Sequence, residues 1–152
     1  MNTLIQLPGT GLQSVGLDAK PEAVGAARSY VTTVLRAWAV PTDIIDIAVL
    51  LTSELATNAV MHGSTVGGAF TVEVRSHGCC IGIEVSDSSA NVPVVHIPAS
   101  ETQHGRGLLL VVELADSWGY YFDSGGLKHV WFHLRVDDPT VPPTDTAVVP
   151  AA

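Results

Sequence analysis

The apolar residues of this chain change their spacing along the sequence, and this change limits the folds that it can adopt. Between residues 21 and 63 they recur every three or four positions, which is typical of one buried face of an α-helix. Over 70–85 and 118–136 they alternate, which is typical of strands with one buried face. A short stretch of helical spacing, 105–116, separates the two strand regions. The helical positions are Val24, Ala27, Val31, Leu35, Trp38, Ile44, Ile47, Leu51, Leu55, Ala59, Leu108, Val111, Val112 and Ala115; the alternating positions are Phe70, Val72, Val74, Ile81, Ile83, Val85, Trp118, Tyr120, Phe122, Val130, Phe132, Leu134 and Val136.

These patterns predict two helices, a hairpin, a third helix and a second hairpin. The first helix is expected to start near Pro21, with Asp18 as a possible cap. One apolar face per strand predicts an α+β fold, a two-layer sandwich of a mostly antiparallel sheet with its helices on one face. Residues 1–19 are predicted to be irregular, 20–136 to form the domain, and the Pro-rich residues 137–152 to be a disordered tail.

The charge and hydropathy of the chain exclude some classes of partner. The net charge is −8, and the seven Lys and Arg residues are scattered. Because phosphate contacts need clustered positive charge, nucleic acid is not an expected ligand. No apolar run reaches the ~18 residues of a membrane span, and the opening MNTLIQLPGTG lacks the features of a secretory signal. We therefore expect a cytoplasmic protein without a membrane anchor.

The second helix carries a row of polar residues, Glu54, Asn58 and His62, at steps of four. Side chains at this spacing lie above one another on one helix face. The row is placed about 100° to one side of Leu55 and Ala59, at the margin of the apolar stripe. It is therefore either a solvated edge or the wall of a site. In a site, Asn58 could bind Mg²⁺ through its amide oxygen and Glu54 could accept a proton.

The strand that ends at Asp87 places a carboxylate on its apolar side, because Asp87 continues the parity of Ile83 and Val85. A buried carboxylate is costly unless it is hydrogen-bonded. Two interpretations are open: Asp87 caps the turn with Ser88 and Ser89, or it accepts an N–H group of a ligand in a pocket between sheet and helices.

A long loop, residues 88–104, leads to the sequence Gly105–Arg106–Gly107 at the start of the third helix. A loop of this length in a compact domain is usually functional or mobile. Glycines at a helix start allow close backbone approach, and the free N–H groups there can bind an anion. They are equally consistent with a hinge or a cap. His104 and Arg106 could add positive charge to a phosphate site.

Taken in order, four blocks of the sequence resemble a known family. They are SELATNAVMHG (53–63), VSDSSANVP (85–93), GRGLLLVVELADSWG (105–119) and KHVWFHL (128–134). They are similar to the N, G1 and G2 boxes and a late strand of the Bergerat-fold (GHKL, histidine-kinase-like) ATP-binding domains. Within that group they look like the stand-alone anti-sigma-factor serine/threonine kinases and related ATP-binding regulators.

The resemblance implies roles for individual residues, with ATP and Mg²⁺ as cofactors. Glu54 would be the catalytic base, Asn58 the ligand of Mg²⁺, and Asp87 the acceptor for the adenine amino group. The wider superfamily has Asp-x-Gly where this chain has Asp87–Ser88–Ser89. Lys128 would lie near the nucleotide without being catalytic. The complete set of expected nucleotide-binding residues is Asn58, His62, Asp87, Ser89, His104, Gly105, Arg106, Gly107 and Leu108.

The resemblance also implies a function. The expected activity is phosphorylation of a STAS-type anti-anti-sigma protein, sequestration of a sigma factor, or both, and a homodimer is plausible through the exposed sheet face or the first helix. One alternative is a catalytically weak, ATP-gated protein-binding module, in which ATP orders residues 88–104. A less favoured alternative is a catalytic fragment of a histidine kinase.

Overall fold

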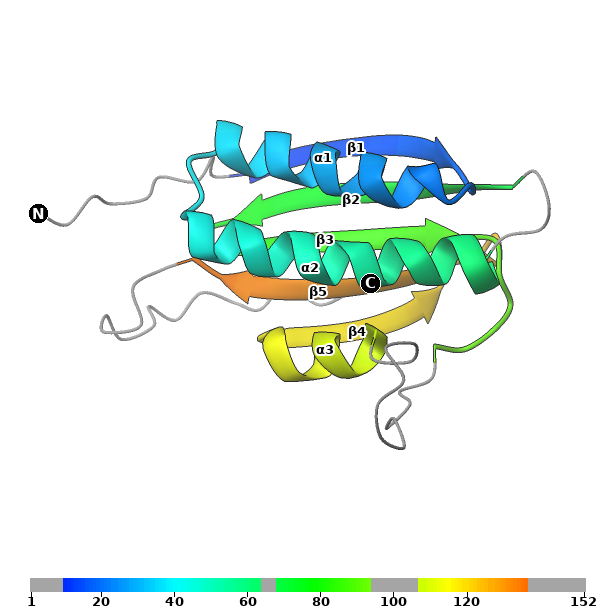
Figure 1. The fold of residues 1–152 in the computed structure, drawn as a ribbon. Helices are drawn as coiled ribbons and strands as arrows, with labels where there is room; N and C mark the ends of the chain where they lie inside the picture. The colour runs from blue at the N-terminus through cyan, green and yellow to red at the C-terminus, as the bar shows by residue number, and fades with distance from the viewer. Residues whose placement is uncertain (1–9, 64–67, 94–106, 137–152) are drawn as a thin grey trace, which may run out of the picture.

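A computed structural model describes residues 10–63, 68–93 and 107–136 of the chain (Figure 1). The predicted tail, 137–152, and most of the predicted lid lie outside the described residues. The elements are β1 (Thr10–Asp18), α1 (Glu22–Ala37), α2 (Thr42–Asn58), a π-helical turn (Ala59–Gly63), β2 (Ala69–His77), β3 (Cys80–Asp87), α3 (Gly107–Leu114), β4 (Ser117–Phe122) and β5 (Lys128–Arg135).

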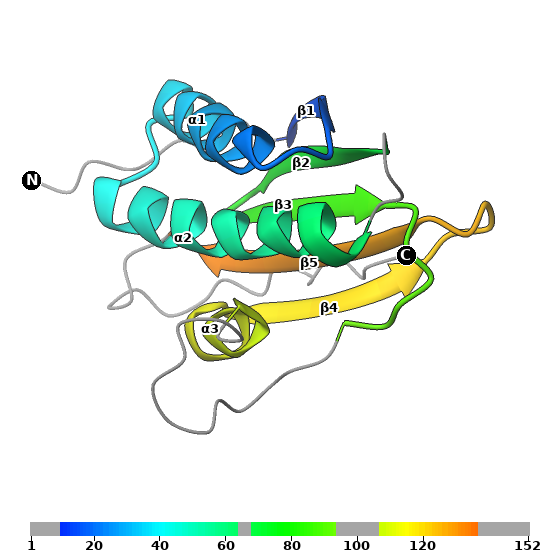
Figure 2. The ribbon, with the colours of Figure 1, turned by 45° about the vertical axis from the view of Figure 1, so that its right-hand side comes forward.

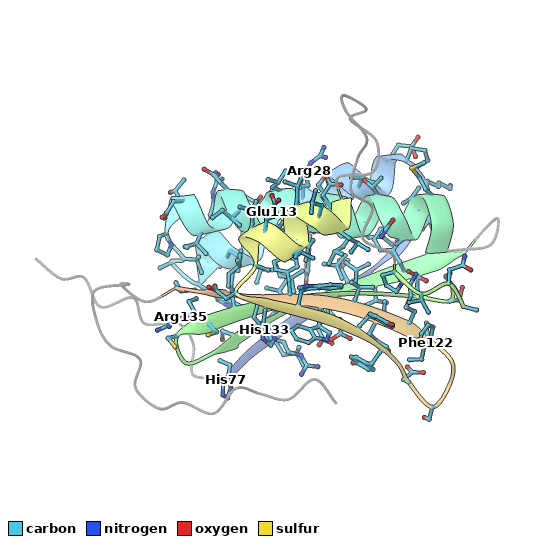
Figure 3. The ribbon with its side chains drawn as sticks, turned by 90° about the horizontal axis from the view of Figure 1, so that it is seen from below. Arg28, His77, Glu113, Phe122, His133 and Arg135 are labelled. Atoms are coloured by element: carbon cyan, nitrogen blue, oxygen red, sulfur yellow. The ribbon has the colours of Figure 1, made fainter. Side chains whose placement is uncertain are left out.

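The strands form one five-stranded sheet in the order β1-β2-β3-β5-β4, in which every neighbouring pair is antiparallel. The three helices lie on one face of this sheet, and Figure 3 shows that no described element forms a layer over the other face. α1 packs over β1 and β2, α2 over β3 and β5, and α3 over β4 (Figures 1 and 2). The α+β, two-layer architecture predicted from the sequence is therefore confirmed.

The first nine described residues differ from the prediction, because β1 occupies a segment that the sequence predicts to be irregular. β1 runs along the outer edge of β2, with Val15 opposite Val72 and Leu17 opposite Phe70. Its glycines and exposed residues interrupt the alternation that reveals the other strands. The strand is therefore stabilised by its backbone hydrogen bonds to β2, and its own side-chain pattern does not predict it.

α1 begins directly after Pro21, as predicted, and α2 begins directly after Pro41. Each of these two long helices buries one stripe of mostly small and aliphatic side chains. The suggested cap, Asp18, instead pairs with Ala69 at the end of β1. The N-cap of α1 is Pro21, which has no side-chain donor or acceptor to offer. The fully buried side chains of α1 and α2 meet those of β2, β3 and β5, which gives one continuous core between the layers.

On the open face of the sheet, His129 is held between two carboxylates. Its Nε2 bonds Oδ2 of Asp123 over 2.9 Å, and its Nδ1 bonds the carboxylate of Glu84. The ring of Tyr121 stacks on the imidazole at 4.5 Å, and its hydroxyl donates to Glu84 over 2.9 Å. Burial acts to lower the pKa of His129, but the hydrogen bonds to Asp123 and Glu84 outweigh it and raise the pKa above 6.5. The imidazole is therefore stabilised in its protonated form, donating from both nitrogens.

Candidate functional site

The register of the sheet aligns Asp87, Lys128 and Phe122 as neighbours across β3, β5 and β4. Directly opposed residues of adjacent strands share a face, and this row lies on the face that carries the helices. Asp87 is only 3% exposed and Lys128 only 5%. The inward parity predicted for Asp87 is thus correct, and the structure places a lysine beside it.

The two oxygens of the Asp87 carboxylate have different partners. Oδ1 accepts the backbone N–H of Ser89 over 2.7 Å, while Oδ2 lies 3.6 Å from Nζ of Lys128. The hydroxyl of Ser89 in turn accepts the N–H of Asn91 over 3.0 Å. Burial raises the pKa of Asp87, and the Ser89 N–H and the Lys128 ammonium oppose that rise without cancelling it. Oδ1 of Asp87 therefore caps the turn, as the first sequence interpretation expects, while Oδ2 lies in the interior beside Lys128. The contact of Asp87 with a ligand stays a prediction.

Part of the helix-facing side of the sheet next to this row is left uncovered by the described helices. Tyr120 lies opposite Val130, and Phe122 lies opposite Lys128, so both rings share the face of the buried core. They are nevertheless 42% and 41% exposed and pack edge to face at 6.3 Å. Figure 2 shows why, since α3 lies over the first half of β4 and does not reach its end. Sequence parity predicted inward-facing rings but could not predict where the covering helix stops.

Glu54 and Asn58 lie one turn apart in the last part of α2, and both are half-buried. Neither side chain has a hydrogen-bond or ion-pair partner among the residues that the structure describes. Burial raises the pKa of the Glu54 carboxyl. A partly desolvated acid without a partner is poised to accept a proton at a pH closer to neutral than an exposed glutamate.

His62 does not continue the row with α-helical geometry. α2 ends at Asn58, and residues 59–63 form a π-helical turn. A π turn bonds residues five apart instead of four. The expected contact of His62 with a nucleotide stays a prediction.

The third predicted cluster is described only in part. His104, Gly105 and Arg106 lie outside the described residues. Gly107 is the first residue of α3, and the side chain of Leu108 is buried in the core. A nucleotide contact of Leu108 would therefore use its backbone N–H. In Figure 1 the start of α3 faces the same end of the domain as the ends of α2, β3 and β4, so the described parts of the three clusters converge on that end.

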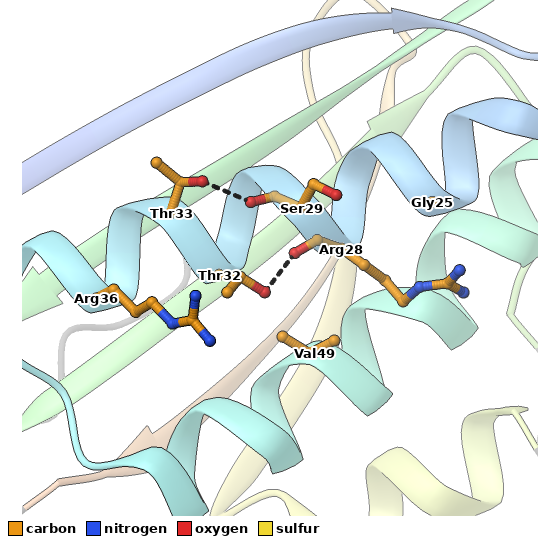
Figure 4. A pocket seen from close by; sticks show the side chains of 7 residues that line it. All are labelled: Gly25, Arg28, Ser29, Thr32, Thr33, Arg36 and Val49. Atoms are coloured by element: carbon orange, nitrogen blue, oxygen red, sulfur yellow. Dashed lines mark hydrogen bonds between the residues drawn. The ribbon is translucent and has the colours of Figure 1, made fainter.

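A groove elsewhere on the surface shares no residue with this site. It follows the outer side of α1, where Arg28 and Arg36 project beside Val49 of α2 (Figure 4). The hydroxyls of Thr32 and Thr33 donate back to helix carbonyls of α1. The groove therefore carries none of the chemistry assigned to the candidate site.

Comparison with known proteins defines the class to which this fold and site belong. Residues 17–134 match the model of the histidine kinase-like ATPase domain, so the chain belongs to that family. A comparison with curated proteins gave no match. Among solved structures, the chain is similar to the RsbU and RsbW domains of Rv1364c from Mycobacterium tuberculosis, with a TM-score of 0.61 and 18% identity. The match covers 88% of this chain and 35% of that one, and it shows the shared fold.

The family implies ATP binding, and the residues predicted to contact ATP have the following surroundings in the structure. Asp87 offers a buried acceptor, the exposed rings of Tyr120 and Phe122 offer apolar surface beside it, and Glu54 and Asn58 have no described partner for their polar atoms. Among the described residues, no three His, Cys, Asp or Glu side chains come together as a metal centre. Mg²⁺ needs only one or two protein ligands when phosphates and water complete its octahedron, and the amide oxygen of Asn58 could be one.

One helical stretch, Thr42–Met61, is long and apolar enough to cross a membrane by length and composition. This stretch comprises α2 and part of the turn that follows, and α2 buries its apolar stripe against the sheet. The core helix of a water-soluble protein passes the same test, so the stretch is weak support for a membrane span. The cytoplasmic location stays a prediction.

Proposed function

We propose that this protein is an ATP-dependent serine/threonine kinase of the anti-sigma-factor type, which phosphorylates a STAS-type anti-anti-sigma protein, sequesters a sigma factor, or both. The observation that carries the proposal is the pairing of Glu54 and Asn58. One offers a carboxylate with a raised pKa and the other an amide oxygen, one helical turn apart at the end of the domain where Asp87 lies.

In this proposal the residues divide the work of phosphoryl transfer. Asp87 accepts a hydrogen bond from the adenine amino group, and Asn58 binds Mg²⁺. The N–H groups at the start of α3, from Gly107, lie against the phosphates, where a helix N-terminus favours negative charge. Bound Mg-ATP supplies the phosphoryl group. Glu54 accepts the proton of the partner's hydroxyl, and the rest of catalysis is positioning and charge stabilisation.

A transfer assay tests the proposal. The purified chain is mixed with γ-labelled ATP, Mg²⁺ and a STAS-type protein from the same genome, and label on the partner is counted. Glu54→Gln should lower the transfer rate by about 100-fold or more, since general-base catalysis contributes on this scale, while ATP affinity changes little. Glu113→Gln, the same change at an exposed position of α3, is the matched control. Equal rates for Glu54→Gln and wild type would show that the base is misassigned.

A second candidate function is an ATP-gated binding module without useful turnover. The observation in its favour is Ser89, which stands where the superfamily pattern has glycine and whose hydroxyl is engaged by Asn91. In this case wild-type protein binds Mg-ATP and changes its affinity for the partner, but neither wild type nor Glu54→Gln transfers label to the partner. The homodimer expected from the resemblance is compatible with both functions.

A further inference from the structure

Lys128 is a buried ammonium group that has fewer partners among the described residues than its chemistry requires. An ammonium has three N–H donors. Among the described residues its only partner is Asp87, and the 3.6 Å between Nζ and Oδ2 exceeds the 2.7–2.9 Å of a good charge-assisted hydrogen bond. A buried charge is costly unless hydrogen bonds satisfy it. At least two of its donors therefore have no described acceptor.

The position of Lys128 in the sheet would allow a bound ligand to accept a hydrogen bond from its ammonium group. It lies at the start of β5, directly between Asp87 on β3 and the exposed ring of Phe122 on β4. The exposed ring of Phe122 is therefore the strand neighbour of the buried ion pair on its β4 side.

Asp87 and Lys128 together present one acceptor and one donor on the same face. Oδ1 of Asp87 is committed to the Ser89 N–H, so Oδ2 is the oxygen available to a ligand. Adenine carries an amino group, which donates, next to ring nitrogens, which accept. When the amino group of adenine contacts Oδ2 of Asp87, one of the adjacent ring nitrogens lies near the side chain of Lys128. This nitrogen is an acceptor, and the ammonium group of Lys128 can donate to it.

We propose that Lys128 is a specificity-determining residue of the nucleotide site and donates a hydrogen bond to a ring nitrogen beside the adenine amino group, while Asp87 accepts from the amino group itself. This inference rests on the proposed function, since it requires ATP at this site. The ion pair seen between Asp87 and Lys128 is then the arrangement from which both groups turn to the base. Lys128 reads the base and takes no part in phosphoryl transfer.

Calorimetry of the full chain tests this with ATP and two analogues, 1-deaza-ATP and 7-deaza-ATP, in each of which a C–H group replaces one ring nitrogen. Wild type should bind one analogue about tenfold more weakly than ATP, the scale of one hydrogen bond to a charged group. Lys128→Met should bind ATP about tenfold more weakly and lose the discrimination. Lys20 is the other lysine of the chain and is exposed, so Lys20→Met should behave as wild type.

Two further results keep the test decisive. Lys128→Arg keeps a donor at the position and should still discriminate, which covers the case in which Lys128→Met fails to fold. Wild-type protein that binds ATP and both analogues equally well overturns the inference and leaves ATP binding intact. Wild-type protein that binds none of the three overturns the inference and the proposed function together.

Discussion

Replacing Asp87 by asparagine gives a test of the site whose size follows from the hydrogen bonds of that carboxylate. Oδ1 is held by the Ser89 N–H at 2.7 Å, and the asparagine oxygen can take over this contact. The amide NH₂ then occupies the place of Oδ2, so a donor replaces the acceptor expected to meet the adenine amino group. The variant keeps the turn and loses the contact with the base.

The lost contact is a hydrogen bond to a charged group, worth about 1.5–3 kcal/mol. At about 1.4 kcal/mol for each factor of ten, the affinity for ATP should fall by roughly 10- to 150-fold. The new amide would also place its own N–H donor against the donating amino group of adenine, which favours the upper part of this range.

Isothermal titration calorimetry with Mg-ATP and Mg-ADP measures the loss, and EDTA controls separate the contribution of the metal. Asp46→Asn is the matched control, because it makes the same chemical change at an exposed position of α2. Circular dichroism reports whether each variant is folded. A folded Asp87→Asn protein that binds Mg-ATP within about threefold of wild type would refute the assignment of Asp87 to the base.

Two further predictions concern the open face of the sheet. A Cβ at Gly119 would lie 2.7 Å from Cζ2 of Trp131, so Gly119→Ala should lower the free energy of unfolding by about 1–3 kcal/mol through overpacking. The control in thermal unfolding is Gly16→Ala, because no described atom lies within 4 Å of the new Cβ there. Equal unfolding midpoints for the two variants would contradict the close contact at Gly119. Because the pKa of His129 is raised above 6.5, its two carboxylate contacts stabilise the fold fully below pH 6.5 and lose this effect as the pH rises through the raised pKa. The unfolding midpoint of wild type should therefore exceed that of His129→Gln most at about pH 6 and least at about pH 9, and a difference that grows with pH would contradict the protonated state.

Local pattern was sufficient for the layers of this fold. The apolar spacing of three and four defined α1 and α2, and the alternation defined β2, β3 and β5, because in these elements one face is buried along the whole length. It missed β1, where only Val15 and Leu17 face the core clearly and pairing with β2 decides the structure. It also missed the π-helical turn after Asn58, since nothing in the local spacing distinguishes it from a further turn of α-helix.

The sequence predicts those features of the site that depend on which face of a strand a residue occupies. The inward position of Asp87 follows from its strand, and the order of the motifs supported the comparison with ATP-binding domains. The neighbourhood of Asp87 and Lys128 depends on the pairing of β3 with β5, which are separated in sequence by α3 and β4. The exposure of Tyr120 and Phe122 depends on where α3 stops covering the sheet. Both are tertiary properties that a spacing rule does not contain.

The central claim is that residues far apart in the sequence surround one molecule of ATP, and a titration of ¹⁵N-labelled protein with Mg-ATP, followed by NMR, tests it most directly. We predict that the largest amide shifts fall together on the end of α2, on Asp87 and Ser89, at the start of α3 and on Lys128. Shifts confined to the groove of Arg28 and Arg36, or no saturable shifts at millimolar Mg-ATP, would contradict the claim.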